Sequence, residues 1–456
     1  MTTLPHHRLN LTASVVGTGT SGLSHDWPGR AWNRFADFRH YEHLARVARR
    51  GVLDAIFLSD HPALSRDTSR APIHTFDPIV LFSAITGAVP DIGFLLTAST
   101  SYNAPYNLAR RIASLDSISG GRVILNLVAN FNPDIAANFG SEPLLPREDR
   151  YRKADEFVQV LEELFLSWDA PVGPLPNGPL WDDTIARPID HHGEFFDIRG
   201  PLNVPIGPQG HPVLAQAGAS PAGIDFAAKR AEIVYAALLS TQGARQLRAQ
   251  IDARAVVHGR SPADLRLLPG ANVVLGDDEA DARRRHEYLN GVGSEDELVA
   301  KFVAQQGALS PDFPAQVDPD APLDPQWFLP REDQQLPVGF TRALHDLVAF
   351  EGLTARQVVR RTGAGGGHRL IVGSPRQVAD GLLDWWAEGL VAGFNVHLPV
   401  LPDDLERFVD EVVPILQAEG AYPRSYESAT IRGRFGLSTP SARTVGTEHT
   451  EAAGAA

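Results

Sequence analysis

The sequence predicts a (β/α)8 barrel, an α/β fold, on three observations. Short apolar runs alternate with amphipathic segments along most of the 456 residues, which is the pattern of parallel strands covered by helices. Eight such pairs can be counted, as an eight-stranded barrel requires. Polar residues gather where the apolar runs end, at the edge where barrels bind ligands. The alternative, a doubly wound open sheet, needs fewer units and usually an early glycine fingerprint.

The stretch from Asp91 to Glu156 shows the repeating unit most clearly. An apolar run, Ile92 to Thr97, stops in the polar cluster TSY (100–102). A helical segment follows, and SGGR then turns the chain into a second apolar run, Val123 to Val128. Because strand–helix–strand crossovers are right-handed, we expect the two runs to be parallel neighbours.

The other elements are expected in chain order. Asp77 before Pro78 has the pattern of a helix N-cap, and Ser374 before Pro375 repeats it. A short strand is expected over 368–373, and a small extra strand outside the barrel over 193–200. The six further barrel strands are 9–16, 54–60, 211–220, 232–238, 265–276 and 393–400. The further helices are 40–51, from 78, 150–168, from 221, 243–258, after 374 and 402–419.

Residues 277–367 interrupt this alternation. Their pattern is helical and irregular, without clear strands, so we interpret them as an insertion between the seventh and eighth barrel strands. The glycines of 363–367 are more typical of a lid hinge than of a phosphate loop, because no strand precedes them and no GK[ST] follows. Residues 1–436 then form one domain. The tail, 437–456, is rich in Ser, Thr, Gly and Ala and is expected to be disordered or an arm.

Composition excludes several classes of function. The net charge of −14 implies no basic face, which argues against nucleic acid as a partner. The absence of cysteine excludes disulfides, thiolate metal sites and a Cys nucleophile. No apolar run approaches the roughly 18 residues of a membrane span, and the first residues lack a secretory signal. A cytoplasmic enzyme without membrane partners is therefore expected.

Metal and hydrolase motifs are missing. His191 and His192 are adjacent, a spacing that does not chelate from one helix or strand, and neither HxH after the first strand nor HExxH occurs. GxSxG is also absent, so a hydrolase nucleophile elbow is unsupported. No metal site is expected.

Polar residues at the ends of different strands are expected to meet at one mouth of the barrel. They are hydrogen-bonding groups with one carboxylate among them, a set suited to a polar planar cofactor. Each alone is more often a turn or cap residue, so only the whole set carries this interpretation. The residues are Asp60, Thr97, Asn126 or Asn130, Ser220 and Asn395.

Two helix starts are candidates for binding an anion. Ser220 precedes a helix whose free N–H groups suit a phosphate. Arg147, Arg150 and Tyr151 lie at another helix start and can close on the same anion.

Each of these assignments has a plainer alternative. Arg150 and Arg152 can form solvated pairs with Asp149 and Glu156. His368, directly after the glycine run, is expected to reach the mouth of the site, and its alternative is a surface histidine.

Long strings of this chain resemble the nitrilotriacetate monooxygenase/dibenzothiophene sulfone monooxygenase group of the bacterial luciferase-like flavin monooxygenases. The resemblance runs from about Leu9 to Gly436 and is far more specific than one short motif. The strings are TASTSYNAPYNLARRIASLDSISGGR, LNLVANFNPDIAANFG, RYRKADEF, RGPLNVPIGPQGHPVLAQAGAS and HRLIVGSPRQVADGLLDWWAEGLVAGFNVHLPVLP.

The resemblance implies a luciferase-like TIM barrel that works as a two-component monooxygenase. Reduced FMN (FMNH2) would arrive from a separate NAD(P)H:flavin reductase and react with O2 to a C4a-peroxyflavin. That oxidant would attack a small organic substrate, with C–N or C–S cleavage or hydroxylation. The insertion also occurs in the group and would cover the site as a lid. Members form dimers or tetramers, so a homodimer or homotetramer is expected.

The resemblance also assigns site residues. The FMN contacts of the group fall on Asp60, Thr97, Arg147, Tyr151 and Ser220. Position 147 departs from the group, which commonly has His four residues before the Tyr, although Arg still binds phosphate.

Three residues are candidates for catalysis: His25, Asn130 and His368. His25 stands for a histidine of the group's first loop. Asn130 replaces a serine and Leu125 an aromatic residue, and both are expected near the flavin. These departures point to a different pocket and leave the substrate open.

Two rival hypotheses are kept. One is a deazaflavin (F420)-dependent oxidoreductase on the same fold, although such relatives usually lack the long insertion. The other is a barrel that has lost its chemistry and binds a flavin or another ligand; the departures at 125, 130 and 147 support it.

Overall fold

The structure is a computed structural model of the whole chain. It describes residues 8–28, 34–64, 75–130, 132–140, 145–169, 183–218, 220–330, 338–363 and 367–440. Within these ranges no helix is both long and apolar enough to cross a membrane.

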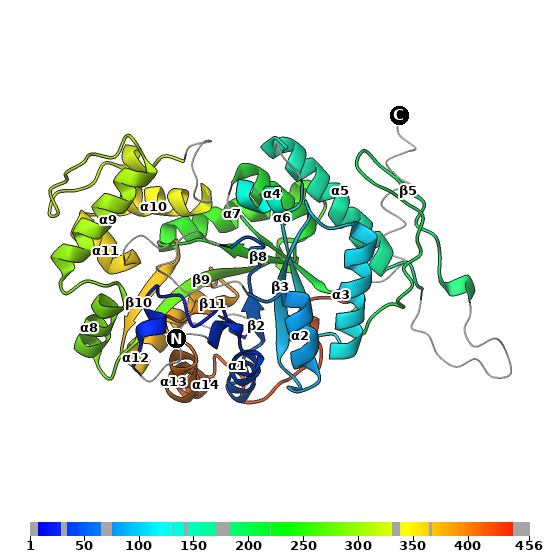
Figure 1. Cartoon of the computed structure of the whole chain (residues 1–456), viewed down its shortest axis with the longest axis horizontal. Helices are drawn as coiled ribbons and strands as arrows, with labels where there is room; N and C mark the ends of the chain where they lie inside the picture. The colour runs from blue at the N-terminus through cyan, green and yellow to red at the C-terminus, as the bar shows by residue number, and fades with distance from the viewer. Residues whose placement is uncertain are drawn as a thin grey trace.

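Eight parallel strands close into a barrel, which confirms the predicted fold (Figure 1). The closing contact is made by β8 with β9, whose residues Ile233 and Arg266 are in register. Parallel neighbours need crossover connections, and helices supply them between most strands. In order around the barrel the strands are β1 (Asn10–Ser14), β2 (Ala55–Leu58), β3 (Gly93–Ser99), β4 (Val123–Val128), β7 (Val213–Ala217), β8 (Ile233–Ala236), β9 (Arg266–Leu275) and β11 (Gly393–His397).

Two helices around the barrel begin at the capping residues that the sequence predicts. Asp77 accepts a hydrogen bond from the N–H of Val80 at 3.0 Å, and Ser374 forms a capping box with Gln377. Both predicted N-caps are therefore confirmed. The helices are α1 (Phe38–Arg50), α2 (Pro78–Thr86), α3 (Pro105–Ser119), α4 (Pro133–Asn138), α5 (Arg147–Phe165), α6 (Pro221–Arg230), α7 (Thr241–Val257), α12 (Pro375–Ala387), α13 (Asp403–Arg407) and α14 (Val413–Ala418).

A ninth strand extends the sheet beyond the barrel. β10 (Arg369–Gly373) pairs with Ala271–Leu275, the second half of β9. At Ala271 and Asn272, β9 also pairs with β11, so β10 lies on the opposite edge of β9. On that edge β8 pairs only with the first half of β9, as far as Pro269. β10 is the short strand expected over 368–373.

The described residues of 277–367 lie between β9 and β10 and contain helices, as predicted. Figure 1 shows these helices as a separate lobe on the left of the barrel. The lobe has an apolar cluster of its own, centred on Phe302 and Leu347, and the cluster reaches Ala237 and Leu239 just after β8. The helices are α8 (Glu279–Leu289), α9 (Glu295–Leu309), α10 (Val338–Glu351) and α11 (Ala355–Thr362).

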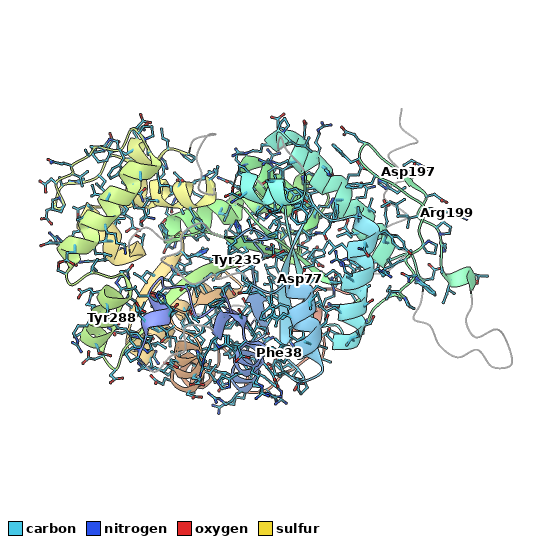
Figure 2. The ribbon with its side chains drawn as sticks, viewed as in Figure 1. Phe38, Asp77, Asp197, Arg199, Tyr235 and Tyr288 are labelled. Carbon is cyan, nitrogen blue, oxygen red and sulfur yellow. The ribbon has the colours of Figure 1, made fainter. Side chains whose placement is uncertain are left out.

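A small antiparallel pair, β5 (His191–His192) and β6 (Asp197–Ile198), projects on the other side. Asp197 and Arg199 mark it in Figure 2. As expected for 193–200, this segment stays outside the barrel.

The C-terminal segment packs against the end of the barrel where the strands begin. Ile431 and Phe435 join the apolar cluster inside the barrel with Ala55 and Ile124, and α15 (Ile431–Arg434) carries Arg434, which donates to the carbonyl of Asp54 at 3.1 Å. This packing shuts one end of the barrel and leaves the other for a site. Of the predicted tail, 437–440 are described, and 441–456 lie outside the described residues.

Candidate active site

A cavity of about 1420 Å³ lies at the carboxyl ends of the barrel strands. This is the end at which barrels of this kind bind their ligands. Every barrel strand contributes to its wall. The strand residues are Ser14, Phe57, Thr97, Asn126, Gln216, Tyr235, Asn272 and His397, in the order β1 to β11.

Most of the residues singled out from sequence line this one cavity. The five candidate FMN contacts all do: Asp60, Thr97, Arg147, Tyr151 and Ser220. Two of the three candidates for catalysis, Asn130 and His368, line it as well. His368 is half-buried and lines the cavity wall, so the alternative of a surface histidine is wrong.

Three other residues are placed differently. His25 is not part of the cavity wall, although Ser21 to Leu23 are; its Nε2 lies 3.3 Å from Asp26. Asn395 is buried behind the wall. Leu125 packs among the apolar residues between strands and helices, so the expectation that it lies near the flavin is wrong.

Strand alternation explains the position of Leu125. Successive side chains of a strand point to opposite faces. Asn126 lines the cavity and Ile124 faces the barrel interior, so Leu125 faces the helices.

The starts of α5 and α6 form an anion-binding corner. Ser220 caps α6 by accepting a hydrogen bond from the N–H of Gly223 at 3.1 Å, which leaves its own O–H to donate to a ligand. A Cβ added at Gly223 would lie 3.1 Å from both the Ser220 Oγ and the Tyr151 hydroxyl, so these two hydroxyls approach one small space. Arg147 lines the cavity beside them. Two hydroxyls, a guanidinium and a helix N-terminus suit a phosphate.

The two neighbouring arginines differ in role. Arg150 lines the cavity and donates from Nη1 to the carbonyl of Asn130 at 3.3 Å. Arg152 pairs in solvent with Asp149 at 2.8 Å and Glu194 at 2.6 Å. The solvated alternative therefore holds for Arg152 and is wrong for Arg150.

Glu156, the other carboxylate named in that alternative, binds elsewhere. It accepts from the backbone N–H of Phe196 at 2.8 Å.

Several polar atoms in the cavity wall have no hydrogen-bond partner among the described residues. Asn126 donates from Nδ2 to the Thr97 hydroxyl at 3.0 Å, but its Oδ1 accepts no hydrogen bond from the described residues. The same is true of Asn130 Oδ1 and Gln216 Oε1, and Arg150 Nε likewise donates to none of them. A buried polar atom left unpaired costs about 1–3 kcal/mol. This wall is therefore suited to a polar ligand.

The charges on the wall favour an anion. Among the described lining residues, the cations are Arg147, Arg150 and Lys301, and the one carboxylate is Asp60. Burial, and then the nearby charge of Asp77, raise the pKa of Asp60 to about 6. The cavity is thus locally positive in a chain of net charge −14.

The arc formed by β8, β9 and β11 carries a second polar cluster. The Tyr235 hydroxyl lies 2.5 Å from His397 Nε2, and the rings of His397 and His368 stack with centroids 4.7 Å apart. Burial lowers the pKa of His368 to about 4 and that of His397 well below its ordinary value, so both rings are neutral at pH 7. Figure 2 shows Tyr235 near the middle of the barrel.

Sequence reasoning missed Tyr235 and His397. The sequence pattern that could have identified them is a polar ring inside an otherwise apolar run, in EIVYAAL and GFNVHLPV. As for metals, the described residues contain no group of three His, Asp or Glu side chains placed to hold an ion.

Comparison with known proteins decides the family. The model of the luciferase-like monooxygenase family matches residues 12–393. This chain belongs to that family. It is a monooxygenase, because relatives that match it over nearly their whole length are named as monooxygenases. The nitrilotriacetate monooxygenase component A of Aminobacter aminovorans is 34% identical over 435 residues, covering 91% of this chain and 93% of the relative.

Solved structures agree with this assignment. An EDTA monooxygenase from Chelativorans sp. BNC1 superposes with a TM-score of 0.81 at 38% identity, over 94% of this chain and 99% of the other. A riboflavin lyase, solved with modified FMN and riboflavin, superposes with a TM-score of 0.76 at 26% identity, over 95% and 97%. The luciferase-like resemblance is confirmed.

Proposed function

We propose that this monooxygenase uses FMNH2 and O2 to oxidise a small organic substrate in the cavity described above. One observation carries the proposal. The five candidate FMN contacts come from segments far apart in the sequence, between Asp60 and Ser220, and all line one cavity. The riboflavin lyase, a structural neighbour, was solved with modified FMN, which supports FMN as the flavin.

The wall fits FMN in two ways. The Ser220, Tyr151 and Arg147 side chains would hold its phosphate, since hydroxyls and a guanidinium match a dianion. The unpartnered oxygens of Asn126 and Gln216 would accept hydrogen bonds from the N–H groups of a flavin ring. When bound and reduced, the flavin supplies the electrons that activate O2.

The protein's own contribution is then binding, orientation and exclusion of water. A cavity of about 1420 Å³ exceeds the roughly 300–1,000 Å³ of common ligand sites, so it has room for a flavin and a substrate together. The insertion contributes Leu289, Lys301 and Phe340 to the wall. We infer that it acts as the lid over the substrate.

A separate NAD(P)H:flavin reductase is proposed as the source of FMNH2. The relative from Aminobacter aminovorans is named component A, which supports a second component. We also propose that the protein is a homodimer or homotetramer, to be tested by light scattering.

The test begins with anaerobic titration of the protein with photoreduced FMN. Arg147→Gln is compared with Arg152→Gln, a matched change five residues further along α5 that leaves the cavity wall intact. We expect tight binding of FMNH2 by the natural protein and by Arg152→Gln, and weaker binding by Arg147→Gln.

Substrate is sought by supplying O2 and a flavin reductase with nitrilotriacetate, EDTA, sulfones and sulfides. Consumption of O2 coupled to one of these compounds would support the proposal. FMNH2 binding without any oxidised product would favour a barrel that has lost its chemistry. Binding of F420 in place of FMNH2 would favour the deazaflavin hypothesis.

A further inference from the structure

The cavity divides into two halves along the strand order. The candidate FMN contacts come from the residues just after β2, from β3 and from the starts of α5 and α6. The opposite arc, β8, β9 and β11, carries Tyr235 and His397, with His368 just before β10. The insertion overhangs this second arc, because Phe340 packs edge-on against His368 with centroids 5.2 Å apart. The second half is therefore the one left for the substrate.

A chain of buried and partly buried hydrogen bonds sets the orientation of His397. The Thr12 hydroxyl donates to Asn395 Oδ1 at 2.7 Å, which turns the NH2 of Asn395 away from Thr12. That NH2 donates to His397 Nε2 at 3.2 Å and to the Tyr235 hydroxyl at 3.4 Å. His397 Nε2 is consequently an acceptor. The Tyr235 hydroxyl lies 2.5 Å from it and 3.5 Å from His368 Nε2, so the shorter contact favours donation to His397.

This arrangement selects one tautomer. A neutral imidazole carries one N–H, and when Nε2 accepts, the proton is on Nδ1. His397 lines the cavity, and no described residue forms a hydrogen bond with its Nδ1. Its Nδ1–H is thus the group offered to a ligand.

We propose that His397 is a fixed hydrogen-bond donor for the substrate, its Nδ1–H binding a carbonyl, carboxylate or sulfonyl oxygen beneath the insertion. The proposal rests on the monooxygenase function above and narrows its substrates to those that carry such an oxygen. Tyr235, Asn395 and Thr12 are positioning residues, which act through His397.

A proton relay is the other role open to a Tyr–His pair, and the surroundings oppose it. Burial raises the pKa of the Tyr235 hydroxyl, so the tyrosinate that a relay would leave is disfavoured. The stacked His368 ring also disfavours a charged His397. Gly270 makes the stack possible, since a Cβ there would lie 2.5 Å from His368 Nδ1.

The tautomer is measured directly by ¹⁵N NMR of the full chain labelled at histidine, with His397→Asn to assign the signal. We expect the Nδ1–H form in the natural protein. Tyr235→Phe and Thr12→Val should each weaken this preference, since one donor to Nε2 remains in each variant; Thr12 lies outside the cavity wall. Thermal melts check that both variants fold. An Nε2–H tautomer in the natural protein overturns the proposal. So does an unchanged tautomer population in both variants.

Binding is then tested on protein saturated with oxidised FMN. Benzamide and benzoate should shift the His397 Nδ1–H signal, whereas toluene, which lacks the oxygen, should not. With a substrate from the screen, Tyr235→Phe should raise KM about tenfold and change kcat less. The assignment would be overturned if FMN alone shifted the His397 Nδ1–H signal fully, or if toluene shifted it as much as benzamide and benzoate do. The tautomer can be read without flavin, so failure of FMN to bind would refute the proposed function separately.

Discussion

Tyr151→Phe isolates one bond to the proposed cofactor. In the described part of the chain the Tyr151 hydroxyl forms no hydrogen bond with protein, while its ring packs edge-on against Phe226 with centroids 6.0 Å apart. Removing the hydroxyl therefore leaves the packing intact. A hydrogen bond to a charged group contributes about 1.5–3 kcal/mol, which at about 1.4 kcal/mol per tenfold corresponds to a roughly 10- to 100-fold rise in the Kd of FMN. The melting temperature without flavin should not change.

The assay is titration with FMN and, separately, with riboflavin, which lacks the phosphate. If Tyr151 binds the phosphate, the variant should lose affinity for FMN and keep its affinity for riboflavin. Equal losses for both flavins, or no loss for FMN, would refute the reasoning. Ser220→Ala is a less clean change, because it also removes the cap of α6 and should cost about 1 kcal/mol of stability.

Three further predictions concern stability. Gly270→Ala should destabilise the fold by about 1–3 kcal/mol through overpacking against His368, whereas Gly307→Ala in α9, where a Cβ meets nothing within 4 Å, should be neutral or stabilising; urea melts compare the two. Asp77→Ala should cost about 1 kcal/mol by removing the cap of α2, again measured by urea melts, and no loss would contradict the capping role. The pKa of Asp60 is raised from 3.8 to about 6, so the folded state binds its proton more tightly than the unfolded state, and stability falls as pH rises between about 4 and 6. Asp60→Asn should remove this pH dependence and raise the free energy of unfolding above pH 6 by on the order of 1 kcal/mol, after allowing for solvent screening. Urea melts of both proteins at pH 4 and pH 7 measure this, and the same difference between the proteins at both pH values would contradict it.

The predicted fold and most of the site could be found from local patterns. Alternating apolar runs gave the barrel, because each β/α unit must bury an apolar strand beneath its helix. The helix caps at Asp77 and Ser374 could be predicted from the local sequence, because their hydrogen bonds stay within one helical turn. Asp60, Thr97 and Ser220 were found together because parallel strands end at one edge.

Two features were beyond the reach of such patterns. A strand buried on both faces is apolar on both, so its sequence does not say which side faces the cavity; Leu125 was misplaced for that reason. A loop near the mouth need not turn each side chain inward, and His25 stays out of the wall while its neighbours line it.

The sequence by itself determined the order of strands and helices, the capped helix starts at Asp77 and Ser374 and the set of polar strand ends. Only the tertiary structure decided which side chains share the cavity wall. Tyr235 and His397 are 162 residues apart and meet because β8, β9 and β11 adjoin where the barrel closes. Contacts of this kind depend on the register and closure of the whole sheet, which no local spacing encodes.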